Sequence, residues 1–301
     1  MRITTQMMTT NYTKNLNTNL NQLQSVTNQI NTGQIVSKPS DNPFLATRMM
    51  EFEAEIASKE QYKRNIEDID GFLTMSDSAL GQLNDQFTRI KELTIQASTG
   101  TNTESELAVI SKEVNQIIHS MVDTLNTNFE DKYIFSGYQT DTKPFELIEN
   151  PDGTFEVRYH GDANVSKVEI SKGIEASTNI TGVEILGDYN GRNLFESLNE
   201  ISKALSANDQ NALTGLLEEV NAHQSNILQL RGKVGAQQSR MEIALNRSEN
   251  EILNLKNVLS KAADTDLASA IIEAKTLETA YLASLQASSY MFQPSLLNFL
   301  K

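Results

Sequence analysis

Between residues 66 and 97 the chain carries a long series of apolar and small residues whose spacing alternates between three and four. Only a helix brings residues with this spacing onto one face, and a long helix with such a face buries it against other helices. The spacing predicts one helix from about residue 43 to 98, roughly 80 Å long at 1.5 Å per residue. The members of the series are Ile66, Ile69, Leu73, Ser76, Leu80, Leu83, Phe87, Ile90, Thr94 and Ala97.

The same spacing returns in later segments, which supplies the long helix with partners inside the chain. Gly100 ends the first helix, and Thr103 with Glu106 predicts a capping box for a second helix that continues to about residue 129. Its seam is Leu107, Ile110, Val114, Ile117 and Met121. Helical pattern resumes at Leu194, breaks near residues 207–209, and then carries a last seam of Ile227, Leu230, Val234, Gln237, Met241, Leu245, Ser248, Ile252, Leu255 and Leu259. Short connections between such helices predict antiparallel packing.

The period changes between residues 131 and 190. Short runs rich in β-branched and aromatic residues alternate there with Gly, Asn and Asp, which is typical of strands and turns. We expect strands in YIFSG, VSKVEI and GVEIL, and a hairpin from Phe145 to Tyr159 that turns at residues 150–153. The segment therefore predicts a small β domain inserted between the helical segments.

Both ends of the chain are almost without charge. Residues 1–36 carry only Arg2 and Lys14, and residues 276–301 carry only Glu278 and Lys301. Each end also shows a helical stripe: Tyr12, Leu16, Leu20, Leu23, Val26 and Ile30 at one, and Ile271, Ala274, Glu278, Tyr281, Leu285, Ser288 and Phe292 at the other. A helix whose polar face is also packed avoids charges, because burying an unpaired charge is costly. We predict two assembly helices that lie side by side.

The stretch TGQIVSKPSDNP at residues 32–43 separates the first of these helices from the long helix. Gly33 can adopt the left-handed conformation that ends a helix, and Pro39 pushes the residue before it away from helical angles. Asn42 is placed to cap the next helix, with Pro43 at its first position. A plain helix–turn–helix explains these residues equally well. The change in charge across the stretch favours a joint between a helix that orders only on assembly and a rod that is already folded in the monomer.

Together these patterns predict a mainly α fold, an elongated antiparallel helical rod formed by both chain ends, with a small inserted β domain. We divide the chain into an N-terminal assembly helix at 1–36, the N-terminal half of the rod at 37–130, and the insertion at 131–190. The C-terminal half of the rod follows at 191–265, and a C-terminal assembly helix at 266–301.

Composition and motifs argue against nucleic-acid binding, metal binding and catalysis. The net charge of −14 disfavours nucleic acid, because phosphate is repelled by an acidic surface, and the absence of cysteine removes thiolate metal sites. His119, His160 and His223 are far apart, and no phosphate-binding glycine loop or HExxH motif occurs. His223 follows Glu219 by one helical turn, which we interpret as a surface pair. We expect no enzymatic activity, no cofactor and no metal site.

The chain contains no segment typical of a secretory signal peptide, and no stretch approaches the roughly 20 apolar residues that span a bilayer. By the usual rules these features predict a soluble cytoplasmic protein with no membrane partner. Those rules cover only the common export routes.

Four stretches resemble the bacterial flagellin superfamily. NQINTGQIVSKPSDNPFLATRM at 28–49 is similar to the family's helix, turn and P-S-D-N-P segment, and LETAYLASLQASSYMFQPSLLNFL at 277–300 is similar to its C-terminal helix. EDKYIFSGYQTDTKPF at 130–145 and LRGKVGAQQSRME at 230–242 resemble, in particular, the members that join the flagellar hook to the filament. The resemblance spans nearly the whole chain.

The resemblance implies a structural role outside the cell. Such proteins are exported unfolded through the flagellar type III channel without a cleaved signal, and their terminal helices, disordered in the monomer, form a coiled-coil inner tube. The implied partners are the first hook-associated protein, flagellin, copies of the same chain in a ring or tube, and an export chaperone for the C-terminal helix. We expect Leu16, Leu20, Leu23 and Ile30 to pair with Tyr281, Leu285, Phe292, Leu296 and Leu297.

Three other functions are compatible with parts of this pattern. Within the same class, the chain could be a flagellin or another flagellin-like filament subunit. From a different class, it could be an intracellular coiled-coil adaptor, for which charged and stably folded terminal helices are expected. An enzyme carried on the β insertion is a third alternative.

Limited proteolysis of the monomer tests the assembly helices. We expect rapid removal of roughly 40 residues from the N-terminus and of a comparable C-terminal piece, because marginal helices without a partner expose their backbone. Mass spectrometry of the surviving core locates the cuts. Termini that resist digestion as well as the core does would contradict helices that depend on assembly.

Overall fold

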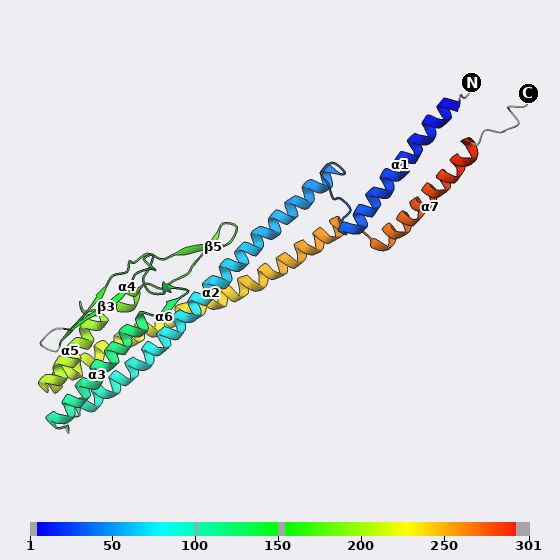
Figure 1. Ribbon diagram of the computed structural model, residues 1–301. Coiled ribbons are helices and arrows are strands. Elements are labelled where there is room, and N and C mark those ends of the chain that lie inside the picture. Colours follow the sequence, from blue (N-terminus) through cyan, green and yellow to red (C-terminus); the bar gives the residue numbers. More distant parts are fainter. Residues whose placement is uncertain (1–4, 100–101, 150–153, 293–301) are drawn as a thin grey trace, which may run out of the picture. The chain divides into compact units, whose positions relative to one another are not determined.

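The structure is a computed structural model that describes residues 5–99, 102–149 and 154–292 (Figure 1). The helices are α1 (Thr5–Thr32), α2 (Pro43–Ser98), α3 (Glu104–Leu125), α4 (Gly182–Leu186), α5 (Leu194–Ala207), α6 (Gln210–Ala263) and α7 (Leu267–Phe292). The strands are β1 (Asn128–Phe129), β2 (Lys132–Tyr133), β3 (Phe145–Glu149), β4 (Phe155–Tyr159), β5 (Lys167–Ser171) and β6 (Ile174–Ser177). The predicted mainly α fold with a small β insertion is confirmed.

The chain forms two compact units. One contains residues 1–58 and 251–301, and the other contains residues 59–250. Both α2 and α6 contribute residues to each unit, whereas α1 and α7 belong only to the first. The β strands, α3, α4 and α5 belong only to the second.

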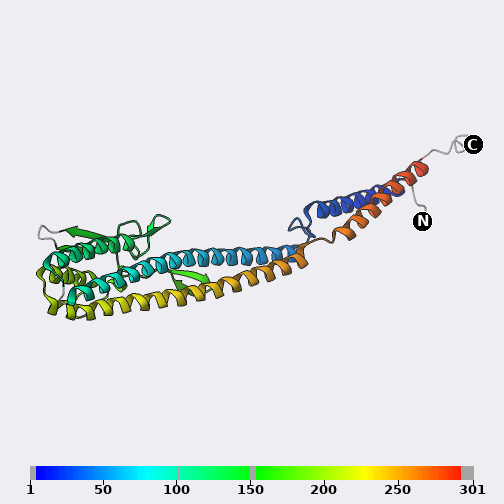
Figure 2. The same cartoon turned by 90° about the horizontal axis from the view of Figure 1, so that it is seen from below.

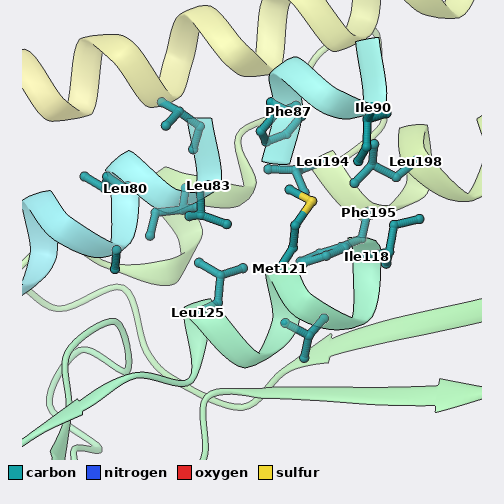
Figure 3. Packing of buried hydrophobic residues seen from close by; sticks show 14 of the residues in the cluster. Leu80, Leu83, Phe87, Ile90, Ile118, Met121, Leu125, Leu194, Phe195 and Leu198 are labelled. Atoms are coloured by element: carbon teal, nitrogen blue, oxygen red, sulfur yellow. The ribbon is translucent and has the colours of Figure 1, made fainter. Parts of the chain in front are cut away.

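The predicted seam of α2 forms the centre of the 59–250 unit. Every member of the series from Ile66 to Ala97 is at most 1% exposed, including its two polar members. The Ser76 hydroxyl donates to the Phe72 carbonyl at 2.8 Å, and the Thr94 hydroxyl donates to the Ile90 carbonyl at 2.7 Å, so neither oxygen is left unsatisfied. Figure 3 shows the middle of the seam packed against Ile118, Met121 and Leu125 of α3 and Leu194, Phe195 and Leu198 of α5.

Within the same unit α2 and α6 run antiparallel (Figure 2). An ion pair joins Arg231 Nε to Asp77 Oδ1 at 3.1 Å, and a second joins Lys63 Nζ to Glu249 Oε1 at 2.7 Å. These pairs sit beside a buried seam on α6 that includes Ile227, Val234 and Met241. Apolar burial therefore holds the two helices together, and the flanking ion pairs, whose side chains are partly exposed, add little to it.

Helix α3 begins as predicted and ends earlier than predicted. Thr103 and Glu106 form the expected capping box. The predicted end near residue 129 is wrong, because the side chain of Asn126 pairs with the backbone of Phe145 in β3. Asn126 Nδ2 donates to the Phe145 carbonyl at 2.9 Å, and the Phe145 N–H donates to Asn126 Oδ1 at 3.0 Å. The asparagine thus replaces a neighbouring strand at the edge of β3.

The β region consists of separate two-stranded antiparallel pairs rather than one sheet: β1 with β2, β3 with β4, and β5 with β6. The predicted hairpin is confirmed, with Phe145 opposite Tyr159, although its turn at 150–153 lies outside the described residues. The ring of Phe145 lies 5.1 Å from the Tyr159 ring and 6.2 Å from the Phe195 ring, centroid to centroid. These aromatic contacts attach the hairpin to α5.

Two predicted strands are wrong. GVEIL forms the short helix α4, which the Thr181 side chain caps by accepting from the Glu184 N–H. The Gly182 N–H donates to the Phe135 carbonyl at 2.8 Å and the residue packs directly against the Tyr159 ring, so a distant contact rather than local propensity determines this turn. In YIFSG only the first residue belongs to a strand, and Gly137, at a φ of +77°, turns the chain away from it.

The expected surface pair of Glu219 and His223 is also a wrong prediction. Glu219 is 8% exposed and His223 is 3% exposed, because α5 and the turn before it cover this face of α6. The Ser197 hydroxyl donates to Glu219 Oε2 at 2.8 Å and lies 3.2 Å from His223 Nε2. Arg192 Nη1 completes the network by donating to Glu219 Oε1 at 3.1 Å. The buried carboxylate is thus both hydrogen-bonded and paired with a cation.

Truncation of the seam tests the core. We expect Phe87→Ala to lower the free energy of unfolding by about 3–5 kcal/mol, because it removes a fully buried ring and leaves a cavity. Phe44→Ala is the matched control, since this ring is 77% exposed, and its effect should stay within about 0.5 kcal/mol. Urea unfolding followed by far-UV circular dichroism measures both, and equal losses would contradict the assignment of the core.

Acidification tests the buried network. Burial lowers the pKa of the His223 imidazole, although the carboxylates of Glu219 and Asp188 act in the opposite direction. The unfolded chain therefore binds a proton more readily, so stability is complete above a pH of about 6.5 and is lost as the pH falls towards the lower folded pKa. Urea midpoints across this range should fall for the wild type and stay flatter for His223→Gln. Parallel curves for the two proteins would contradict a role for His223.

Candidate assembly interface

In the unit of residues 1–58 and 251–301, α1 and α7 lie side by side and antiparallel (Figures 1 and 2). The Tyr12 hydroxyl, near the start of α1, donates to the Ser284 carbonyl of α7 at 2.8 Å. At the other end of the pair, Leu23 and Ile30 line the same groove as Ile271 and Ala274. The prediction that the two terminal helices lie side by side is therefore confirmed.

The apolar stripe of α1 is only partly covered by α7. Val26 is buried, at 6% exposed, whereas the other members of the stripe are half-buried. These half-buried residues are Tyr12, Leu16, Leu20, Leu23 and Ile30, and the positions between them are mostly exposed Asn, Gln and Thr. One partner helix covers one side of such a stripe and leaves the rest accessible.

Helix α7 presents mainly small residues to α1. Ala270 is buried, and the half-buried residues of α7 follow it at spacings of four and three: Ala274, Leu277, Tyr281, Ser284 and Ser288. Three members of the predicted stripe are exposed: Ile271 at 50%, Leu285 at 39%, and Glu278. Phe292 is the last residue of α7 and its side chain is not described, while Leu296 and Leu297 lie outside the described residues.

A second set of apolar residues on α7 is exposed. Its members are Leu267, Ile271, Ile272, Leu282 and Leu285, between 39% and 68% exposed. The sequence prediction of a single stripe missed Ile272 and Leu282. The sequence does contain a signal for Ile272 and Leu282, since each directly follows another apolar residue. Adjacent residues in a helix point about 100° apart, so they cannot share one narrow stripe. Helix α7 therefore carries apolar side chains on more than the side that faces α1.

An open groove of about 360 Å³ runs between α1 and α7. Its lining is Leu23, Thr27, Ile30, Ile271, Ala274, Lys275 and Glu278. The two charged residues at its edge pair with each other, since Lys275 Nζ lies 2.8 Å from Glu278 Oε2. The groove thus offers an apolar floor with a neutralised rim, which suits an apolar side chain from another helix.

The stretch after α1 has the predicted caps and one unpredicted attachment. Gly33 has a φ of +72°, and the Leu45 N–H donates to Asn42 Oδ1 at 3.1 Å where α2 begins, so both local predictions are confirmed. The segment also pairs with the connection between α6 and α7. The Ile35 N–H donates to the Ala263 carbonyl at 2.7 Å, and the Thr265 N–H donates to the Gly33 carbonyl at 2.8 Å. The two connections are therefore held together at their backbones.

A small apolar cluster supports this attachment. Val36, Ala46, Met49 and Ala263 are buried together, with Leu45 and Leu259 packed against them. Pro39 lies exposed on the same connection. Since the cluster includes only four buried side chains, it stabilises the connection far less than the long seam of α2 stabilises the other unit.

The described residues show neither a membrane-spanning helix nor a metal centre. None of the helices in these ranges combines the length and apolarity needed to cross a bilayer. Among the described residues, no three His, Cys, Asp or Glu side chains gather closely enough to bind a metal ion.

Comparison with known proteins identifies the family. The model of the bacterial flagellin N-terminal helical region matches residues 3–140, and the model of the flagellin C-terminal helical region matches residues 217–300. The chain belongs to the bacterial flagellin family. The first match contains α1, α2 and α3, and the second contains most of α6 and all of α7. The candidate interface therefore consists of the parts that this family shares.

Relatives within the flagellin family differ in how much of the chain they match. Flagellar hook-associated protein 3 of Escherichia coli strain K12 is 25% identical over 94% of this chain and 96% of its own length. The flagellin of the same strain is 31% identical, but over only 33% of this chain and 20% of its own length. The flagellin of Halalkalibacterium halodurans is 22% identical over 86% of this chain and 84% of its own.

Solved structures of hook-associated proteins share the fold. The crystal structure of Bacillus cereus FlgL is 27% identical, with a TM-score of 0.58 over 70% of this chain and 99% of that chain. A putative flagellar hook-associated protein from Vibrio parahaemolyticus is 19% identical, with a TM-score of 0.67 over 74% of this chain and 100% of that chain. The flagellar junction protein FlgL from Legionella pneumophila has a TM-score of 0.58 at 14% identity, over 72% of this chain and 100% of that chain.

Proposed function

We propose that this chain is a structural subunit of the bacterial flagellum that joins the hook to the flagellin filament. The observation that carries the proposal is the even match to hook-associated protein 3, which extends over 94% of this chain and 96% of the Escherichia coli relative. A filament subunit is the second candidate, supported by the match to the Halalkalibacterium halodurans flagellin over 86% of the chain. An intracellular coiled-coil adaptor is disfavoured, because its helices need a charged surface that α1 lacks.

The exposed apolar residues of α7 support assembly through the terminal helices. Leu267, Ile271, Ile272, Leu282 and Leu285 remain accessible although α1 packs against α7. Apolar area left exposed on one chain is buried when further helices pack on it, which stabilises an assembly by about 25 cal/mol per Å². The groove that contains Leu23 and Ile30 provides a place for such a side chain. Copies of the same chain are the partners that repeat this geometry around a tube.

The low charge of both helices suits the same arrangement. In a tube of packed helices, a charge on any face is either buried or stacked near its copies, and both arrangements are unfavourable. Along α1 the exposed positions are mainly amides and hydroxyls, which can pair with neighbours without a net charge. We infer that Tyr12, Leu16, Leu20, Leu23, Ile30, Tyr281, Leu285, Phe292, Leu296 and Leu297 belong to this interface.

The remaining parts of the proposal concern domains and partners. Residues 1–36 and 266–301 act as assembly helices, 37–130 and 191–265 as the two halves of a rod, and 131–190 as the insertion. Gly33, Pro39, Asn42 and Pro43 form the joint between the first helix and the rod. The partners are the first hook-associated protein, flagellin, further copies of the chain, and an export chaperone for the C-terminal helix. The protein reaches the flagellum outside the cell without a cleaved signal and has no enzymatic role.

Deletion of the gene tests this function. We expect cells with hooks but no filaments, and with flagellin lost to the medium, as seen by electron microscopy and by immunoblots of the supernatant. Complementation with Leu282→Asp should fail to restore filaments, because the exposed apolar face of α7 then carries a charge into the assembly.

Ile243→Asp is the matched control, since Ile243 on α6 is 68% exposed and the change in charge is the same. This variant should restore filaments. Both purified variants should show wild-type circular dichroism, which separates a failure of assembly from a failure of folding. Normal filaments with Leu282→Asp would contradict the role of α7, and filaments in the deletion strain would contradict the junction function itself.

A further inference from the structure

The turn between α4 and α5 holds the Asn190–Gly191 dipeptide at the surface. Tyr189 and Arg192 exchange backbone hydrogen bonds of 3.0 and 3.1 Å, so the two residues between them form a tight loop. Asn190 has a φ of +56° and Gly191 a φ of +77°, as a two-residue hairpin loop requires. Both residues are exposed. The Gly191 N–H donates to Asp188 Oδ1 at 2.8 Å.

Asparagine followed by glycine is chemically labile. The glycine nitrogen, once it has lost its proton, can attack the asparagine side-chain carbonyl carbon, and the absence of a glycine side chain leaves that approach open. A bond forms between the Gly191 nitrogen and Asn190 Cγ, the bond from Cγ to the side-chain nitrogen breaks, and ammonia leaves with the proton. Water then opens the cyclic imide at either carbonyl, which yields aspartate or isoaspartate.

We propose that Asn190 is a site of spontaneous deamidation that the folded turn suppresses and the unfolded chain permits. The attacking nitrogen must lose the proton that Gly191 now donates to the Asp188 carboxylate. A carboxylate that accepts this hydrogen bond stabilises the N–H form and repels the nitrogen anion. The paired backbones of Tyr189 and Arg192 also hold the loop in its conformation. Asp188 therefore slows deamidation of Asn190 only while the turn is formed.

The isoaspartyl product has a structural consequence beyond the turn. Isoaspartate adds one atom to the main chain of a two-residue loop, and the pairing of the residues that flank such a loop depends on its length. Arg192 is one of these residues, and its Nη1 lies 3.1 Å from Glu219 Oε1. Displacing Arg192 leaves the buried Glu219 carboxylate without its cation, and its remaining hydrogen bond among the described residues is the one from the Ser197 hydroxyl. Deamidation at the surface thereby loosens the attachment of α5 to α6.

The suppression of deamidation by the folded turn is tested by incubating the full chain at neutral pH with and without urea. Peptide mass spectrometry then measures the rate of deamidation at Asn190. We expect deamidation of Asn190 to be at least about tenfold slower in the folded protein, the factor given by one hydrogen bond to a charged acceptor. Asp188→Ala should accelerate the folded-state reaction by a similar factor. Asp188→Asn, which keeps the shape and removes the charge, should fall between the two, and Asn190→Gln should block the reaction.

Equal rates in folded and unfolded protein, or an unchanged rate in Asp188→Ala with native circular dichroism, would overturn the guarded site. The displacement of Arg192 by isoaspartate is tested by comparing the urea midpoints of unfolding. Protein enriched in isoaspartate, as quantified by enzymatic methylation, should unfold at lower urea than the fresh protein. Asn190→Asp introduces the charge without lengthening the backbone and should unfold close to wild type. If the isoaspartate-enriched protein and Asn190→Asp unfold at the same urea midpoint, the proposed release of Arg192 is wrong.

Discussion

Burial of the apolar seam on α2 is the interaction on which the larger unit depends. From Ile66 to Ala97 no member of the seam is more than 1% exposed, and α3, α5 and α6 all contribute to its cover. The polar members remain compatible with burial because Ser76 and Thr94 return their hydroxyl hydrogens to the carbonyls of their own helix. Once this seam is covered, the neighbouring helices have defined positions, and the β region can attach to them.

The terminal helices show what happens when such a seam has only one partner. In the described part of α1 Val26 is the buried apolar residue, at 6% exposed, and in that of α7 it is Ala270, at 5%. Neither helix gains the burial that holds α2 in place, and most of a helix's stability in a protein comes from packing its apolar face. The 59–250 unit therefore has an extensive buried core, whereas the terminal helices leave apolar residues exposed. This difference in burial is what the proposed assembly through the terminal helices rests on.

Polar side chains, rather than a continuous sheet, attach the β region to the helices. Asn126 pairs with both backbone groups of Phe145, and Asn65 Nδ2 of α2 donates to the Glu169 carbonyl of β5 at 2.8 Å. The network of Arg192 and Glu219 secures the next connection in the same way. Because two-stranded pairs are marginal on their own, these bonds and the aromatic contacts behind them decide where each hairpin lies.

Residue spacing predicted the long helices, the seams of α2, α3 and α6, and the caps, because each depends on residues three or four apart along the chain. It also pointed to both terminal helices and to the ends of the stretch between Gly33 and Pro43. Residue spacing did not predict that GVEIL is a helix, that Glu219 and His223 are buried, or which side of α7 faces α1. Each of these depends on segments distant in sequence, such as Tyr159 beside Gly182 or Ser197 beside Glu219. Local spacing carries no record of such neighbours, so the fold supplies them.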